Sequence, residues 1–283
     1  MKTLVYDTAN PNAPPLEGLG RLPFGGGRGE AFGGGRYTHL FFDLDNTLWD
    51  FSVNSREALK QTLEKLDLIG QLKSFEEYFI LYEQINESLW SDYRTKKITK
   101  KTLITGRFSR SLEAFHVTNQ DWEGINRLYL ENMALQTRLF PDTIETLSYL
   151  KAKGYQMHII TNGFREVQNA KLRNCGLTGF FGKVFISEEI KNTKPHREIF
   201  EHALKSTNAP KKRSIMIGDS WETDIEGALA FGMDQVMFLN DGQNKVPDSI
   251  NSIKITSCTS HLEIKHPIKT WFINGIADLV TIL

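Results

Sequence analysis

The stretch Phe41-Phe42-Asp43-Leu44-Asp45-Asn46-Thr47-Leu48 places two carboxylates directly after an apolar run that begins at His39. This run, residues 39–42, predicts a short, fully buried strand of the kind found in the middle of a parallel sheet. Asp43 and Asp45 then fall at the C-terminal end of the strand, where open α/β sheets place their ligand sites. Two acids so close together near a buried strand repel each other and lose hydration, and a cation relieves that cost. The stretch therefore suggests a divalent metal.

Asp43 and Asp45 on their own have a more ordinary interpretation, as residues of a turn that caps a following helix. Three further polar stretches downstream change it, and they come in the order Thr161-Asn162-Gly163, Lys194-Pro195 and Gly218-Asp219-Ser220 with Asp224. Each stretch alone is also ordinary, because it fits a turn, a surface lysine or a capped loop. Their occurrence in this order, each at the end of an expected strand or in the loop after it, points to one shared site.

The composition is that of an ordinary globular protein, with 283 residues, 40% hydrophobic and 24% charged. Lys plus Arg and Asp plus Glu both number 34, which gives a net charge of zero. A general binder of nucleic acids or of membrane surfaces needs a basic excess, so this balance argues against both. No apolar run approaches the roughly 18 residues needed to cross a bilayer.

The two cysteines, Cys175 and Cys258, stand far apart and outside any metal-ligand spacing. We interpret both as reduced thiols, which fits a reducing cytoplasm. The N-terminus also lacks the charged and then apolar pattern of a secretion signal. The sequence therefore predicts a cytoplasmic protein.

The chain divides into regions of different pattern. Residues 1–36 are rich in Gly and Pro and predict a flexible leader, since such a segment buries little surface. Its glycines do not form a phosphate loop, because no strand precedes them and no Gly-Lys-Ser/Thr follows. Residues 51–138 carry apolar side chains at three- and four-residue spacing, which predicts a helical domain inserted after the first strand. The expected helices of this insert are 52–68, 75–93, 100–115 and 121–136.

Residues 37–50 and 139–283 are the expected α/β core. Strand and helix patterns alternate after Pro141, which predicts βαβ units and a doubly wound parallel sheet with helices on both faces. The expected strands are 155–161, 184–187, 214–218 and 235–239, and the expected helices are 142–153, 165–174, 195–206 and 222–231. Beyond residue 240 we expect a last strand at 252–256 and a last helix at 271–283.

The polar residues near the strand ends suit a phosphoryl group held with Mg²⁺. Mg²⁺ takes oxygen ligands, and the carboxylates of Asp43 and Asp219 with the backbone carbonyl of Asp45 are the expected ones. A carboxylate that attacks a phosphate dianion faces repulsion, which Mg²⁺ and the Lys194 ammonium both offset. The remaining phosphoryl oxygens are expected to bond to Thr161 and Asn162.

Together these motifs resemble those of the haloacid dehalogenase superfamily, over about residues 37–240. The matching motifs are Asp43-Leu44-Asp45-Asn46-Thr47, Thr161, Lys194-Pro195 and Gly218-Asp219-Ser220-Trp221-Glu222-Thr223-Asp224. The resemblance implies a Rossmann-like core. It also implies that Asp43 is a nucleophile that forms an aspartyl-phosphate, and that Asp45 protonates the leaving oxygen and then activates water. The other implied roles are phosphate binding for Thr161 and Lys194, Mg²⁺ binding for Asp219, and support of the metal or of Lys194 for Asp224.

Two features narrow the resemblance. True dehalogenases of the superfamily lack an Asp two residues after the nucleophile and need no metal, so Asp45 favours phosphate ester hydrolysis. The insert lies between the first and second motifs, which are 161 − 47 = 114 positions apart. This resembles the subfamily with a helical C1-type cap over the active site. Such a cap excludes water and selects the leaving group, and it favours small-molecule substrates over proteins.

A narrower similarity is to the noncanonical pyrimidine nucleotidases, a group of nucleoside 5′-monophosphatases. It is carried by residues 45–51, 161–168, Lys171-Leu172, Cys175-Gly176-Leu177, Asn86-Glu87-Ser88-Leu89-Trp90 and Gly106-Arg107-Phe108. It implies hydrolysis of pyrimidine nucleoside monophosphates. Trp90, Tyr93 and Arg107 are then candidates for contact with the base or sugar, with aromatic packing plus a surface salt bridge as the alternative.

Two other functions stay open. A phosphatase or mutase for sugar phosphates or phosphoglycolate would share every core residue and would differ only in the insert. A catalytically idle phosphate-binding relative is the second alternative, and the intact motifs argue against it.

Overall fold

The computed structural model describes residues 36–239 and 268–283. The chain forms two compact units. The helical unit consists of Phe51–Arg138 and Phe164–Gly176, and the α/β unit contains the rest. The sequence pattern assigns 164–176 to the α/β core, whereas in the structure this segment groups with the insert. The expected leader, the expected strand at 252–256 and Cys258 lie outside the described residues.

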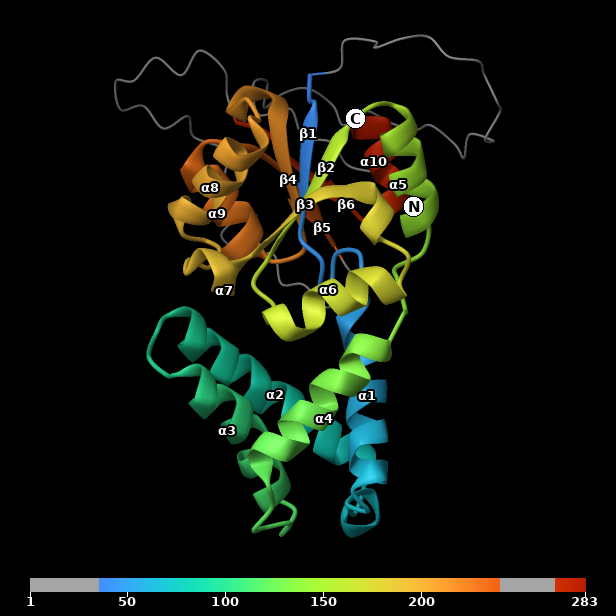
Figure 1. The fold of residues 1–283 in the computed structure, drawn as a ribbon, viewed down its shortest axis with the longest axis vertical. Coiled ribbons are helices and arrows are strands. Elements are labelled where there is room, and N and C mark those ends of the chain that lie inside the picture. The colour runs from blue at the N-terminus through green and yellow to red at the C-terminus, as the bar shows by residue number, and fades with distance from the viewer. Residues whose placement is uncertain (1–35, 240–267) are drawn as a thin grey trace, which may run out of the picture. The chain divides into compact units, whose positions relative to one another are not determined.

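The α/β unit is built around a six-stranded parallel sheet in the order β3-β2-β1-β4-β5-β6 (Figure 1). The strands are β1 (His39–Phe42), β2 (Gln156–Thr161), β3 (Phe181–Ile186), β4 (Ser214–Gly218), β5 (Asp234–Phe238) and β6 (Thr270–Ile273). β1 pairs with β2 on one side and with β4 on the other, so the strand order reverses at β1. Such a reversal leaves a crevice at the carboxyl ends of the strands, where ligands bind in open α/β sheets.

Helices cover both faces of this sheet, with α8 and α9 on one side and α5 and α10 on the other (Figure 1). Their bounds are α5 (Thr143–Ala152), α7 (Ser187–Ile190), α8 (Arg197–Thr207), α9 (Glu226–Phe231) and α10 (Leu279–Ile282). Single 3₁₀ turns lie at Thr178–Phe180, Lys211–Arg213 and Ile276–Asp278, and a π-helical turn lies at Trp221–Ile225.

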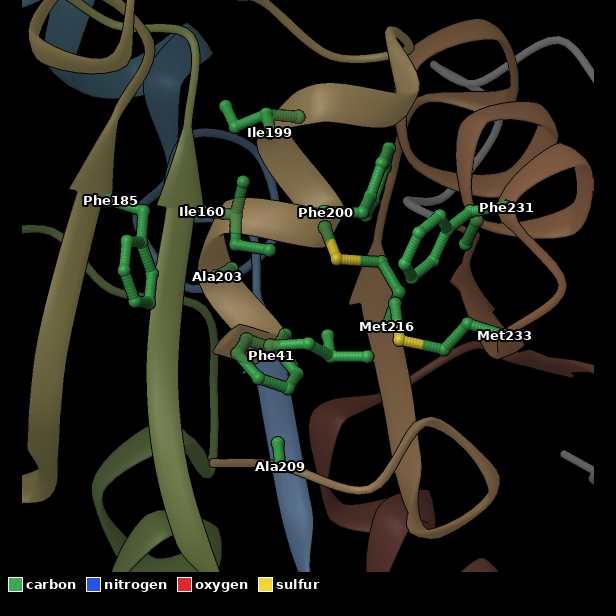
Figure 2. Close-up of a cluster of buried hydrophobic side chains, with 12 residues drawn as sticks. Phe41, Ile160, Phe185, Ile199, Phe200, Ala203, Ala209, Met216, Phe231 and Met233 are labelled. Atoms are coloured by element: carbon green, nitrogen blue, oxygen red, sulfur yellow. The ribbon is translucent and has the colours of Figure 1, made fainter. Parts of the chain in front are cut away.

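The core under α8 and α9 forms because alternate strand residues point to the same face of a sheet. Phe41, Ile160 and Met216, from three adjacent strands, are fully buried there. They belong to one cluster with Phe200 of α8 and Phe231 of α9 (Figure 2). Burying an aromatic or aliphatic side chain of this size stabilises the fold by about 1.5–3 kcal/mol. This packing holds the strand ends, and the polar residues after them, in fixed positions.

The helical unit has five helices in the part of the chain that the structure describes, with an added 3₁₀ turn at Ile69–Gln71. They are α1 (Phe51–Lys65), α2 (Phe75–Arg94), α3 (Lys100–Glu113), α4 (Trp122–Leu135) and α6 (Arg165–Asn174). Ser74, Thr99 and Asp121 cap α2, α3 and α4 by accepting a backbone N–H three residues on. α6 packs against α4, which explains why residues 164–176 group with the insert.

The C-terminal region differs in its first part from the helix expected over 271–283, whereas Ile276–Asp278 and Leu279–Ile282 are helical as expected. Residues Thr270–Ile273 form β6, which pairs in parallel with β5. Trp271 and Ile273 are buried while Thr270 and Phe272 are half-buried, which is the alternation of a strand. A short apolar run fits a strand or a helix equally. Here the segment forms a strand because it can pair with the free edge of β5. Among the described residues, no helix is both long and apolar enough to span a membrane.

Candidate active site

Asp43 sits at the crevice because strand pairing continues one residue past β1. Its N–H donates to the carbonyl of Ile217 in β4 at 2.8 Å. The chain then turns sharply, since Leu48 and Trp49 both donate to the carbonyl of Leu44 at 3.0 and 2.9 Å. Asp45 lies in this turn and is half-buried. The two acids of the first motif therefore leave the strand in different surroundings.

Lys194 joins three separate stretches of the chain at this crevice. Its Nζ donates to Asp43 Oδ1 at 2.7 Å and to Asp224 Oδ1 at 2.6 Å. Lys194 is 1% exposed and Asp224 is fully buried. Burial lowers the pKa of the Lys194 ammonium, but the Asp224 and Asp43 carboxylates outweigh burial and raise it above its usual value. Lys194 therefore stays charged inside the protein.

Three carboxylates converge on one point of the crevice. Asp43, Asp219 and Asp224 each offer an oxygen, and these atoms lie within 4.8 Å of one another. Burial, with Asp224 and Asp45 nearby, raises the pKa of Asp43 to about 7 despite the opposing effect of Lys194. Burial and the charges of Asp43 and Asp224 also raise the pKa of Asp219 well above its usual range.

These acids fit a divalent cation. With all three carboxylates ionised and Lys194 charged, three negative charges and one positive charge leave a net charge of −2. One Mg²⁺ balances that charge, and its preferred ligands are carboxylate and carbonyl oxygens. Burial is the main reason why the pKa values of Asp43 and Asp219 are raised, and neighbouring carboxylates add to it; a bound cation would oppose both effects.

Asp224 is held at both ends of its carboxylate. Its Oδ1 accepts from Lys194, and its Oδ2 accepts from the backbone N–H of Ser220 at 3.1 Å. The π-helical turn Trp221–Ile225 directs the side chain back toward β4. Gly218 leaves the room for it, because a Cβ atom there would lie 2.3 Å from Asp224 Oδ2. Asp224 thus bonds to Lys194, which is the contact that one of its two expected roles requires.

Two further residues belong to this cluster. Thr47 is fully buried, and its hydroxyl donates to Asp219 Oδ1 at 3.2 Å. Ser220 caps the π-helical turn by accepting from the N–H of Thr223 at 3.3 Å. Both stand inside quoted motifs, but the motifs predicted no separate role for either residue. Only the fold shows that Thr47 faces Asp219, which lies 172 positions away.

Thr161 ends β2 and Asn162 follows it, beside the same crevice. Thr161 is buried, and its Oγ accepts from the N–H of Gly163 at 3.1 Å. The Asn162 side chain has a partner that the sequence did not indicate. Its Nδ2 donates to the Lys194 carbonyl at 3.0 Å, and its Oδ1 accepts from the Lys194 N–H at 2.9 Å. The amide that was expected at the phosphoryl group thus bonds to the main chain of Lys194.

The helical unit brings Trp90 and Tyr93 together with Phe164. The ring centroids of Trp90 and Tyr93 are 5.7 Å apart, and Phe164 lies 4.8 Å from Trp90 and 6.3 Å from Tyr93. Lys100 Nζ lies 4.3 Å from the Phe164 centroid and donates to Glu166 at 2.9 Å. Trp90 and Tyr93 are half-buried, whereas Phe164 is buried. These three rings form an aromatic cluster that keeps some accessible ring surface.

Arg107 has different surroundings. It is 2% exposed, and it donates to Asn86 Oδ1 at 3.4 Å and to Asn126 Oδ1. Its guanidinium carbon lies 4.9 Å from the centroid of Tyr129. Among the described residues, its hydrogen bonds and ring contacts are with neighbours in the interior of the helical unit and not with Trp90 or Tyr93. The surface salt bridge that was the alternative for Arg107 is wrong, because the residue is buried and bonds to neutral amides.

Comparisons with known proteins agree with this geometry. The family model described as haloacid dehalogenase-like hydrolase matches residues 37–232. Pyrimidine 5′-nucleotidase PynA of Streptococcus pneumoniae is 31% identical over 203 residues, which cover 71% of this chain and 84% of PynA. A glyceraldehyde 3-phosphate phosphatase of Methanothermobacter thermautotrophicus is 34% identical over 70% of this chain and 84% of its own. The magnesium-bound structure of the HAD-hydrolase YfnB from Bacillus subtilis has a TM-score of 0.73 at 26% identity, over 88% of this chain and 99% of YfnB.

Proposed function

The chain belongs to the haloacid dehalogenase-like hydrolases, and we propose that it is a Mg²⁺-dependent phosphatase that hydrolyses nucleoside 5′-monophosphates, pyrimidine nucleotides foremost. The observation that carries the phosphatase chemistry is the buried Lys194 ammonium bonded to both Asp43 and Asp224, with Asp219 alongside. A phosphate ester needs an oxygen nucleophile and positive charge close to it. The similarity to PynA supports the nucleotide as substrate.

Asp43 is the nucleophile in the proposed mechanism. One of its oxygens bonds to phosphorus as the bond between phosphorus and the ester oxygen breaks, and Asp45 gives its proton to that leaving oxygen. Asp45 then takes a proton from water, the water oxygen bonds to phosphorus, and inorganic phosphate leaves Asp43. Asp45 is suited to both steps because it stands two residues after Asp43 and is half-buried.

Positive charge and hydrogen-bond donors hold the phosphoryl group during both steps. The Lys194 ammonium is fixed beside Asp43, and the Thr161 hydroxyl lies on the last residue of the neighbouring strand β2. Mg²⁺ held by Asp43, Asp219 and the Asp45 carbonyl would reduce the repulsion between the nucleophile and the phosphate. Thr47 would orient Asp219 for that role, since its hydroxyl donates to Asp219 Oδ1.

The aromatic cluster supports a nucleoside as the leaving group. Trp90 and Tyr93 present ring surface that is only half-buried. Stacking between a base and an aromatic side chain contributes about 1–3 kcal/mol per base. We therefore propose that Trp90 and Tyr93 contact the base. A sugar phosphate is the second candidate substrate, because the archaeal glyceraldehyde 3-phosphate phosphatase has a similar level of identity.

Phosphate release from a panel of esters tests the proposal. The panel holds UMP, dUMP, dTMP, AMP, GMP, phosphoglycolate and several sugar phosphates, each with Mg²⁺ and with EDTA. We expect metal-dependent turnover with the pyrimidine monophosphates foremost. Preference for the sugar phosphates or phosphoglycolate would keep the mechanism and reject the nucleotidase. No turnover on any ester would favour an idle relative.

A pair of tryptophan variants tests the aromatic cluster. Trp90→Leu should raise KM for the pyrimidine nucleotide by about tenfold, the equivalent of one modest stacking contact. Trp122→Leu is the control, because Trp122 is also a half-buried tryptophan of the helical unit but is not part of the cluster. Equal effects of the two variants on KM would contradict base stacking on Trp90.

A further inference from the structure

The Asn162 amide ties the loop after β2 to the loop before α8. Its Nδ2 and Oδ1 bond to the carbonyl and N–H of the same residue, Lys194, at 3.0 and 2.9 Å. Lys194 belongs to no helix or strand, so its main-chain groups have no ladder or helical partner. Buried backbone groups need a partner, and the Asn162 amide supplies one for each. The start of the Lys194 side chain is thereby fixed.

The other end of Lys194 is fixed as well. The ammonium bonds to Asp43 and Asp224 at 2.7 and 2.6 Å. A lysine side chain has four carbons and loses much rotamer freedom when it is ordered. Holding the main chain reduces how much of that ordering the two carboxylates must impose. Loss of the Asn162 amide would therefore loosen the ammonium at a distance.

We propose that Asn162 is a positioning residue that aligns Lys194 with Thr161 for the same phosphoryl group. The inference rests on the proposed phosphatase function. It adds a link between the motif at Thr161 and the motif at Lys194-Pro195. Thr161 directly precedes Asn162, so one short segment carries both the phosphate-binding hydroxyl and the amide that sets Lys194. A phosphoryl group bonded to Thr161 then lies at a fixed position relative to the Lys194 ammonium.

Asn54 in the helical unit makes the same pair of bonds and provides a matched control. Its Nδ2 donates to the Arg138 carbonyl at 2.8 Å, and its Oδ1 accepts from the Arg138 N–H at 3.1 Å. Asn54→Ala and Asn162→Ala therefore remove the same two hydrogen bonds at different places. A purely structural role predicts that the two variants behave alike.

Chemical labelling of lysines in the native protein tests the proposal without any substrate. Acetic anhydride labels an amine at a rate that follows its exposure, and peptide mass spectrometry gives the rate for each lysine. Lys171 is also buried, at 3% exposed, and serves as the internal reference for general unfolding. We expect Asn162→Ala to speed the labelling of Lys194 at least about tenfold while Lys171 stays at the wild-type rate.

Asn54→Ala should leave the labelling of Lys194 as slow as in the wild type. The proposal is overturned if Asn162→Ala leaves Lys194 as protected as in the wild type, or if Lys194 and Lys171 become reactive together. Because labelling needs no turnover, a wild type that hydrolyses no phosphate ester would reject the proposed function and leave the labelling result to decide the role of Asn162.

Kinetics supply a second readout with p-nitrophenyl phosphate as the probe. Asn162→Ala should lower kcat/KM by about 100-fold, the scale of a misplaced catalytic group. In a Lys194→Gln background the same change should cost less than about threefold, because the residue that it positions is gone. Full additivity of the two substitutions would contradict action through Lys194. The Asn54→Ala effect should be additive with Lys194→Gln.

Discussion

Two buried cations, Lys194 in the α/β unit and Arg107 in the helical unit, are accommodated in different ways. Lys194 is 1% exposed and bonds to two carboxylates, with a third close by. Arg107 is 2% exposed, and among the described residues its hydrogen bonds go to the neutral amides of Asn86 and Asn126. Burying an ion costs several kcal/mol unless its surroundings compensate.

The two surroundings distinguish a site that can bind further ions from the packed interior of the helical unit. Around Lys194 three carboxylates surround one ammonium. The excess negative charge suits Mg²⁺, and the ammonium suits a phosphate. Around Arg107, the two terminal guanidinium nitrogens bond to neutral amides of α2 and α4, and the ring of Tyr129 packs against the guanidinium. Among the described residues, Arg107 Nε has no hydrogen-bond partner. Burial alone therefore does not mark a catalytic cation, whereas an excess of opposite charge beside it does.

Asp43→Asn should have the largest effect. An amide is too weak a nucleophile to form the phosphoenzyme, so kcat/KM should fall at least about 10,000-fold. Asp121→Asn is the control, since Asp121 caps α4 and Asn caps helices equally well. Circular dichroism should show both variants folded. Turnover by Asp43→Asn within tenfold of the wild type would remove Asp43 from the nucleophile's role.

Gly218→Ala should come next. The added methyl group would lie 2.3 Å from Asp224 Oδ2, so Asp224 must move away from Lys194. We expect kcat/KM to fall by about 1,000-fold, because an ammonium without its second carboxylate is misplaced. Gly179→Ala tests the same substitution where no atom lies within 4 Å, and it should leave kcat/KM near the wild-type value. Equal activity of the two variants would contradict the role given to Asp224.

Arg107→Ala should act on stability instead of chemistry. It removes packing against Tyr129 and leaves two amide oxygens without a donor, so the free energy of unfolding should fall by about 3 kcal/mol. Urea denaturation measures this loss. At temperatures where the variant is folded, its KM and kcat should stay within about threefold of the wild type. A selective rise in KM for nucleotides would instead restore Arg107 as a substrate contact.

His158 shows what burial does to a base without a counter-charge. It lies in β2, stacked at 5.1 Å on Phe41, and within the described part of the chain neither ring nitrogen has a hydrogen-bond partner. Burial, with His39 and Lys183 nearby, lowers the pKa of His158 from 6.5 to about 4. The unfolded chain therefore binds a proton first as the pH falls. The stability gained from the neutral ring is complete above pH 6.5 and is lost between 6.5 and about 4.

His158→Leu should reduce the loss of stability between pH 6.5 and about 4. Wild-type stability should fall by about 2 kcal/mol more than that of the variant across this window, allowing for solvent screening. The measurement is urea denaturation at several pH values. His116→Asn, at an exposed histidine with a φ of 63° that Asn tolerates, should keep the wild-type pH dependence. A parallel pH dependence for wild type and His158→Leu would contradict the assignment.

Much of both units could be predicted because their signals are local. A buried run followed by acids predicts β1 and its site, and helix spacing predicts α1 to α4 within three residues at each end. The pattern at 271–283 misled because β6 is short and its identity depends on pairing with β5, a distant partner. The allocation of 164–176 depends on α6 packing against α4, which the spacing within α6 does not contain.

The site was predictable as a set of residues but not as a set of bonds. The order of the motifs predicts that Asp43, Lys194 and Asp219 meet, because parallel strands end at one edge. It does not predict that the Asn162 amide turns to the main chain of Lys194, or that Thr47 reaches Asp219. Such contacts depend on side-chain direction in loops, where sequence carries no periodic signal.

The most direct test of the account is to find where the phosphoryl group goes. The enzyme is mixed with Mg²⁺ and its best substrate from the panel, stopped with acid during turnover, and digested for peptide mass spectrometry. The account predicts one phosphoryl group on the peptide that contains Asp43, placed on Asp43 by fragmentation and absent when EDTA replaces Mg²⁺. A phosphoryl group on any other residue, or rapid turnover in which Asp43 never carries one, would contradict it.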